Sequence, residues 1–162
     1  NDDNPLLNCR IEGLEKKSPN LIILDRLLNI KKESTIFKKI KKKIYLLTTV
    51  ENPVKEKFFK KIGVKVIKIK KMDNDTINLK NIFFKIKKLG FNRILVESGI
   101  TFLNALIKDR LIQNFYLFKS SINLGRSGLN NTSPVYIKKI KFSERHKINV
   151  NLEGDALYKV RL

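Results

Sequence analysis

The chain has 162 residues, enough for one domain with a single hydrophobic core. Hydrophobic residues make up 42% of the sequence, which excludes a disordered chain, and the apolar runs are too short to cross a bilayer. The formal charge of +20 suggests nucleic acid as a partner, but lysine is spread through the whole sequence, so we expect a solvated basic surface and no nucleic-acid partner.

The first half of the chain combines three short apolar strands with one helix. Strands are predicted over residues 20–25, 43–50 and 64–69, where leucine and β-branched side chains cluster. A helix is predicted over residues 51–62 and ends at Gly63. Because parallel strands are commonly joined through helices, this order favours a mainly parallel sheet.

The middle of the chain carries two predicted helices on either side of a buried strand. The strand covers residues 93–97, after a helix over residues 78–89 that ends at Gly90. Each helix has apolar side chains at three- and four-residue spacing, which predicts a face packed on the sheet. These side chains are Leu79, Ile82, Phe83 and Ile86 in the first helix, and Phe102, Leu103, Leu106 and Ile107 in the second.

The C-terminal part ends in a predicted β-hairpin. A strand over residues 114–121 and a loop over residues 122–134 come first. The hairpin strands cover residues 148–152 and 156–160 and are joined by a tight turn at residues 153–155. The sequence therefore predicts a single α/β domain, with a mainly parallel sheet flanked by helices and a C-terminal antiparallel β-hairpin.

The aromatic residues fall mainly on predicted core faces of helices and strands. We therefore expect them to fill the core and not to form the stacking platform of a protein that binds single-stranded nucleic acid. They are Phe58, Phe59, Phe83, Phe84, Phe115, Tyr116 and Phe118.

The turn after the strand over residues 93–97 is the first candidate site. In open α/β sheets, ligands lie at the carboxyl ends of strands, where main-chain amides at the start of the next helix hold a phosphate. Gly99 would let a diphosphate approach the main chain, Thr101 would add a hydroxyl, and Glu97 would face the cleft. A simple helix cap is the alternative, because a single glycine at a strand-helix turn is common, and the segment is not a GxGxxG fingerprint.

Two further segments carry an arginine suited to binding an anion. Arg10, with Leu7 near it, has the forked guanidinium that binds a phosphate or carboxylate through two hydrogen bonds. A surface ion pair is its alternative role. The loop over residues 124–128 contains Arg126 and two glycines and is a second place for an anion, with a flexible connection as the alternative.

Other chemistries are excluded by the residues that the chain contains. The only histidine, His146, lies in a charged turn without a Ser-His-Asp arrangement, and no HxE with a downstream PCxxC is present for zinc-dependent deamination. The only cysteine, Cys9, has no partner for a disulfide or a metal cage, so we expect no metal and a reducing, cytoplasmic location. The chain starts without a signal peptide and without an initiator Met.

Three segments together resemble the C-terminal reductase domain of the bifunctional riboflavin-biosynthesis deaminase/reductase, which has a dihydrofolate-reductase-like fold. They are DNPLLNCR at residues 3–10, LDR at residues 24–26 and VESGITFL at residues 96–103, in the family's order and spacing. The helix and strand that follow, and the Leu-Gly pair at residues 124–125, extend the similarity to nearly the whole chain.

The resemblance implies NADPH as hydride donor and 5-amino-6-(5-phosphoribosylamino)uracil as substrate. By position, Asp3 resembles a cofactor contact, while Leu7, Arg10 and Glu97 resemble substrate contacts. Arg26 stands where the family commonly has a serine that meets the cofactor, and a basic group there would favour the NADPH phosphate. The family's main-chain arc around the diphosphate is similar to Gly99, Ile100, Thr101, Phe102, Leu103, Asn104 and Ala105.

The chain also departs from the family pattern. Asn4 replaces the usual second Asp, and Ser98 stands where Gly or Ala is common. The family's domain opens with a strand and a helix upstream of this segment. The opening strand carries a lysine and a serine that lie close to substrate and cofactor. This sequence starts after that strand and helix. We therefore expect an incomplete domain that is not fully active alone and that lacks the deaminase half; the resemblance also implies a homodimer.

Two other functions compete with this hypothesis, and a third possibility is that the chain serves chiefly as a dimer partner. The first is another NADPH-dependent reductase of the same fold that acts on a related pyrimidine or pterin. The second is a basic nucleic-acid-binding α/β domain, which the charge supports but which has no compact recognition motif in this sequence.

Overall fold

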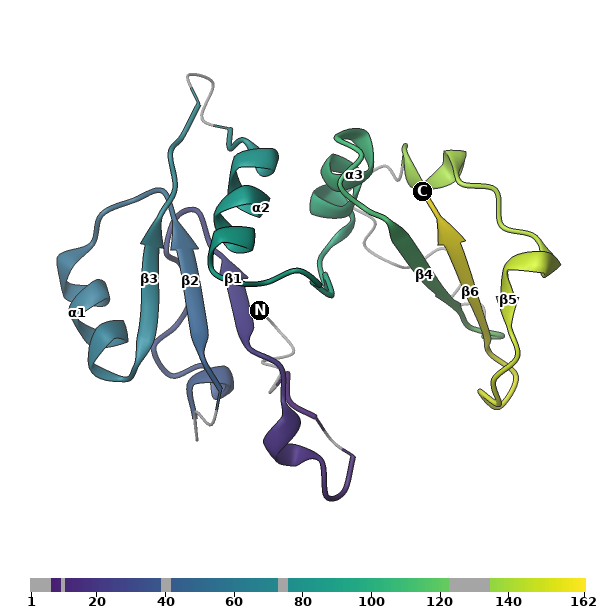
Figure 1. Cartoon of the computed structure of the whole chain (residues 1–162), viewed down its shortest axis with the longest axis horizontal. Coiled ribbons are helices and arrows are strands. Elements are labelled where there is room, and N and C mark those ends of the chain that lie inside the picture. The colour runs from purple at the N-terminus through teal and green to yellow at the C-terminus, as the bar shows by residue number, and fades with distance from the viewer. Residues whose placement is uncertain (1–6, 10, 39–41, 73–75, 123–134) are drawn as a thin grey trace. The chain divides into compact units, whose positions relative to one another are not determined.

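The computed structural model describes residues 7–9, 11–38, 42–72, 76–122 and 135–162 (Figure 1). The chain divides into two compact units, Asn1–Asn78 and Leu79–Leu162. Each unit is built around its own three-stranded sheet. Among the described residues, no helix has the length and apolar character needed to cross a bilayer.

The first unit contains a parallel sheet whose strand order is β1-β2-β3. Its strands are β1 (Leu21–Leu24), β2 (Ile44–Thr48) and β3 (Val64–Lys68), in register at Leu21–Ile44 and Ile44–Val64. All five residues of β2 are buried, as expected for a central parallel strand that is covered on both faces. The three predicted strands of the first half are confirmed, each slightly shorter than expected.

The helix α1 (Pro53–Lys61) connects β2 to β3 and packs against β3 (Figure 1). Pro53 occupies the first turn, where its missing N–H has no partner inside the helix. The Asn52 side chain accepts a hydrogen bond from the Lys55 amide at 2.9 Å and so caps the helix. Gly63 follows the helix with φ of +80°, a left-handed conformation that glycine adopts without strain.

The core of the first unit lies where α1 and the loops meet the sheet. Phe59 is completely buried, and its ring lies 5.2 Å from that of Phe37 and 5.5 Å from that of Phe58. Such tilted and edge-on aromatic contacts add to the free energy gained by burying the rings. The other buried members of this cluster are Leu28, Ile30, Ile36, Ile44, Leu46 and Val64.

The second unit begins with α2 (Leu79–Lys88), in which Leu79, Ile82 and Ile86 are buried as their spacing predicts. Its next helix, α3 (Ile100–Lys108), is followed by β4 (Asn114–Lys119). Leu106 on α3 is completely buried. Both helices are therefore confirmed, while the remaining predicted apolar positions, Phe83, Phe102, Leu103 and Ile107, are half-buried.

The sheet of the second unit is antiparallel, with strand order β4-β6-β5. Its other strands are β5 (Lys147–Ile148) and β6 (Ala156–Arg161). The predicted hairpin and its turn are present, since the Asp155 amide donates to the Leu152 carbonyl at 3.0 Å. The predicted strand over residues 148–152 is wrong in its extent, because only Ile148 within that range belongs to a strand. Four short 3-10 helices complete the described elements: Glu15–Lys17, Thr35–Phe37, Ile137–Lys139 and Glu144–His146.

One predicted strand is wrong. Residues 93–97 form no strand, and Ile94, Leu95 and Val96 are exposed, with Leu95 at 79%. A β-strand needs ladder hydrogen bonds to a neighbouring strand, and none of the strand pairs among the described residues includes this segment. Its apolar side chains indicated a strand, but they do not specify a partner for its main chain.

Several aromatic side chains also lie outside the core that the sequence predicts. Phe59 and Phe115 are buried, but Phe84, Tyr116 and Phe118 are 58%, 46% and 67% exposed. The predicted fold class is confirmed: the molecule is a mixed α/β protein with a parallel sheet, flanking helices and a C-terminal antiparallel sheet. That the two units form one domain stays a prediction.

Candidate functional site

The carboxyl edge of the parallel sheet positions Arg26, the second residue after β1. The Arg26 carbonyl accepts hydrogen bonds from the hydroxyls of Thr48 and Thr49, both at 2.9 Å, and from the Thr49 amide at 3.1 Å. Thr48 is completely buried, so its hydroxyl needs this partner. These bonds fix the end of β1 against the end of β2, at the edge where open α/β sheets bind ligands.

The turn after β1 is held by further hydrogen bonds. A carboxylate oxygen of Asp25 accepts from the Ile30 amide at 2.7 Å. The Leu28 carbonyl accepts from the Lys55 ammonium of α1 at 2.6 Å, and Leu28 has a positive φ of 56°. Arg26 therefore lies in a structured turn at the carboxyl edge of the sheet, and its side chain is half-buried.

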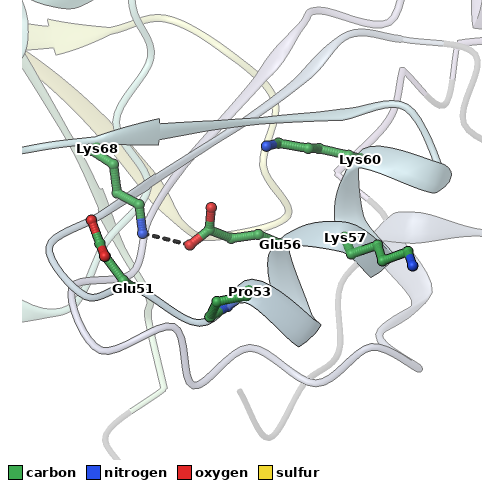
Figure 2. A pocket seen from close by; sticks show the side chains of 6 residues that line it. All are labelled: Glu51, Pro53, Glu56, Lys57, Lys60 and Lys68. Atoms are coloured by element: carbon green, nitrogen blue, oxygen red, sulfur yellow. Dashed lines mark hydrogen bonds and ion pairs between the residues drawn. The ribbon is translucent and has the colours of Figure 1, made fainter.

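An open hollow of about 440 Å³ lies between the start of α1 and the end of β3. The Lys68 ammonium reaches across it to the Glu56 carboxylate at 2.6 Å and to the Val50 carbonyl, as Figure 2 shows for the ion pair. The lining residues are Glu51, Pro53, Glu56, Lys57, Lys60 and Lys68. The hollow contains charges of both signs, and the sequence alone did not indicate it.

Glu56 supports the start of α1 as well as the ion pair. Its carboxylate accepts from the Asn52 amide at 3.1 Å, while Asn52 caps the helix in return. The hydrogen bond from Lys68, and then that from the Asn52 amide, lower the pKa of Glu56 from its ordinary value of 4.5. The carboxylate is therefore stabilised in its charged form.

Replacing Glu56 by glutamine is expected to lower the free energy of unfolding at pH 7 by at most about 1 kcal/mol, because the pair lies at the surface. A carboxyl whose pKa is lowered by folding contributes fully above its ordinary pKa, and the contribution is lost as the pH falls through the lower folded value. The difference in the free energy of unfolding between E56Q and wild type should therefore decrease toward zero as the pH is lowered. Urea titrations from pH 7 downward measure it, with Glu51→Gln as control. A difference that is constant with pH would contradict the assignment.

The second unit contains the predicted site residues around the start of α3. Gly99 is the N-cap of the helix, with φ of −68°, and its carbonyl accepts from the Leu103 amide at 3.1 Å. A Cβ built on Gly99 would meet no atom within 4 Å. The main chain at this helix start is therefore accessible to a ligand, as the anion hypothesis requires.

The side chains near this helix start differ in exposure. Glu97 lies in the extended segment two residues before Gly99 and is exposed, as are Ile100 and Thr101. The next four residues are half-buried: Phe102, Leu103, Asn104 and Ala105. Since the predicted strand that would end at Glu97 is absent, the expected strand-turn-helix is confirmed only in its turn and helix.

The predicted residues near the N-terminus and in the central loop are only partly described. Leu7 is half-buried with φ of +48°, and its carbonyl accepts from the Lys42 ammonium. Asp3, Arg10 and the loop over residues 124–128 lie outside the described residues. The site residues thus divide between the two units, with Leu7 and Arg26 in the first and the Glu97 to Ala105 segment in the second.

The chain is similar to known proteins of riboflavin biosynthesis. A family model described as RibD C-terminal domain matches residues 1–152. Riboflavin biosynthesis protein RibD of Aquifex aeolicus (strain VF5) is 31% identical over 116 residues, which are 72% of this chain and 31% of that protein. The solved structure of Acinetobacter baumannii RibD, form 2, matches with a TM-score of 0.72 and 18% identity, over 99% of this chain and 43% of that one. The chain spans less than half the length of both relatives.

Proposed function

The chain belongs to the RibD C-terminal domain family, whose model matches residues 1–152, and from this premise we propose that it is an NADPH-dependent reductase of riboflavin biosynthesis. The proposed reaction converts 5-amino-6-(5-phosphoribosylamino)uracil to 5-amino-6-(5-phosphoribitylamino)uracil. The family match is the observation on which the proposal rests. The residues at the Arg26 turn and at the start of α3 fit the phosphates of NADPH.

NADPH is proposed to contact both charged side chains and main-chain amides. The open space around Gly99 fits a diphosphate, because a closely approaching anion would meet no side chain of that residue. Arg26 at the sheet edge fits the additional phosphate that distinguishes NADPH from NADH. Asp3 is the third proposed contact, and the full diphosphate arc comprises Gly99, Ile100, Thr101, Phe102, Leu103, Asn104 and Ala105.

The substrate is proposed to contact Leu7, Arg10 and Glu97. The always-charged guanidinium of Arg10 would bind the substrate phosphate. Glu97 is exposed, so its carboxylate is available to accept hydrogen bonds from the uracil ring. Leu7 would supply an apolar contact beside them.

The protein's contribution to the reaction is proposed to be placement. When bound, NADPH supplies the hydride. Glu97 would orient the uracil ring and Arg10 would fix the phosphate, which together hold the reacting carbon in one position. The alternative, reduction of a related pyrimidine or pterin, is tested by comparing kcat/KM over a panel of such substrates in the full-length protein.

Replacing Glu97 by glutamine is expected to lower kcat/KM for the uracil substrate by about 10- to 100-fold, because a hydrogen bond to a charged group contributes about 1.5–3 kcal/mol. NADPH affinity should stay unchanged, since Glu97 is assigned to the substrate. Steady-state kinetics and NADPH titration of the full-length protein measure both quantities. Glu33→Gln, which changes another exposed glutamate on the other unit, is the control. If E97Q keeps the wild-type kcat/KM, Glu97 is not a substrate contact.

The proposal includes the setting in which the reductase works. We propose a cytoplasmic enzyme that pairs as a homodimer, with the two units acting as one domain. Sedimentation of the full-length protein tests the pairing, and a single cooperative unfolding transition seen by several probes would support the single domain.

A further inference from the structure

The antiparallel sheet of the second unit has one covered face and one exposed face. Residues directly opposite each other on antiparallel strands project from the same face. Phe115 pairs with Val160 and both are buried, and the Phe142 ring lies 5.8 Å from that of Phe115. Tyr116 and Phe118 alternate with Phe115 along β4, so they project from the opposite face.

The exposed face presents two aromatic rings. Tyr116 is 46% exposed and Phe118 is 67% exposed. They are two residues apart on β4, which separates their Cα atoms by about 6.6 Å. Exposed aromatic rings on a sheet are surfaces on which the bases of a single strand stack, whatever their sequence.

Cationic side chains lie beside these rings on the same face. Lys159 is paired with Tyr116, and its ammonium lies 5.5 Å from the centre of that ring. Arg161 follows two residues later on β6 and is paired with Asn114. Both cations are exposed, so they are available to neutralise phosphates.

An open hollow of about 580 Å³ adjoins the two cations. His146 also lines it, and the Nδ1 of this histidine is held 3.0 Å from the Ser143 hydroxyl. The lining residues are Gln113, Asn114, His146, Lys159, Val160 and Arg161, none of which is acidic. The hollow therefore favours an anion that also accepts hydrogen bonds from amide side chains.

We propose that this face of the β4-β6-β5 sheet binds single-stranded nucleic acid. Bases stack on Phe118 and Tyr116, and the phosphates lie along Lys159 and Arg161. The formal charge of +20 attracts such a polyanion at long range. The proposal departs from the expectation of no nucleic-acid partner, which rested on the spread of lysine through the sequence and on placing both aromatic rings in the core.

A second copy of the chain is the competing occupant of this face. A two-fold interface brings the same patch of each subunit together. It would therefore bring Lys159 and Arg161 of both subunits into one interface, where four like charges repel each other. A single-stranded nucleic acid offers bases to stack on the rings and phosphates to pair with the cations, so charge complementarity favours it over a second copy.

The test measures binding of a fluorescent twelve-nucleotide oligo(dT) to the full-length protein by anisotropy at several salt concentrations. Phe118→Ala is expected to weaken binding by about 5- to 100-fold, the range of one base–aromatic stack. Lys159→Gln with Arg161→Gln is expected to reduce the slope of log K against log salt by about 1.4, since each phosphate contact with a single strand contributes about 0.7. Both variants should keep the wild-type melting temperature and the wild-type NADPH affinity, because the changed side chains are exposed and lie outside the proposed cofactor contacts.

Lys57→Gln with Lys60→Gln is the matched control, because it removes two exposed charges from α1 in the other unit. If this control reduces binding and salt slope as much as the sheet variant does, and F118A binds as wild type, the attraction is only that of the overall charge and the proposal is wrong. It is also wrong if no oligonucleotide binds and F118A instead abolishes a dimer in sedimentation. If the wild-type protein does not bind NADPH, the proposed reductase function is contradicted, but the oligonucleotide measurement is unaffected.

Discussion

Replacing Phe59 by alanine is expected to lower the free energy of unfolding of the first unit by about 3–5 kcal/mol. The Phe59 side chain is completely buried between α1 and the parallel sheet, and its ring contacts those of Phe37 and Phe58. Removing the ring loses its transfer free energy and leaves a cavity that the surrounding side chains only partly fill. The loss is large compared with the whole stability of a small protein.

Urea denaturation followed by circular dichroism measures this loss, with Phe84→Ala as the matched control. Phe84 also lies on a helix, but it is 58% exposed and its ring mainly faces the Lys88 ammonium at 4.7 Å. F84A should therefore change the free energy of unfolding by less than about 1 kcal/mol, the value of an exposed cation–π contact. Equal losses in the two variants would show that Phe59 does not organise the core.

Local sequence patterns were sufficient for the helices. The apolar positions of α2 recur at three- and four-residue spacing, and Leu79, Ile82 and Ile86 are buried as that spacing requires. A helix satisfies its own main-chain hydrogen bonds, so its existence depends mainly on residues close in sequence. Gly63 and Gly90, both with positive φ, mark the ends of α1 and α2 for the same local reason.

Strands depend on partners that are distant in the sequence, and here the prediction was less complete. The central strand β2 is buried throughout, and its continuous apolar run identified it. Residues 93–97 have a similar composition, yet they are exposed and unpaired among the described strands. Composition measures the tendency of a segment to enter a sheet, but not whether a neighbouring strand edge is available to it.

The candidate sites show the same limit. The sequence indicated Gly99 because a glycine between an apolar run and a helix is a local signal, and it indicated Arg26 only through the family resemblance. The hydrogen bonds from Thr48 and Thr49 to Arg26 join residues more than twenty positions apart. The pairing of Lys68 with Glu56 and the exposure of Phe118 likewise follow from how distant segments pack, which no local pattern encodes.

Replacing Gly99 by aspartate is expected to weaken NADPH binding by at least about 100-fold. The aspartate carboxylate would occupy the start of α3, where the diphosphate is proposed to lie. Two like charges about 4 Å apart repel by up to about 4 kcal/mol near a protein surface. The side chain would also accept hydrogen bonds from the amides that the diphosphate needs.

The fold should tolerate this change, which makes the binding result interpretable. A Cβ at Gly99 would meet no atom within 4 Å, and aspartate is among the preferred N-cap residues. Gly99→Asn is the matched control, because asparagine caps a helix equally well without a charge, and it should weaken binding by about 10-fold, as expected for the loss of one or two hydrogen bonds. Titration of NADPH fluorescence and a thermal melt of each variant measure both properties. If G99D binds NADPH as tightly as wild type does, the amides at the start of α3 do not receive the diphosphate, and the cofactor assignment of the whole segment from Gly99 to Ala105 is wrong.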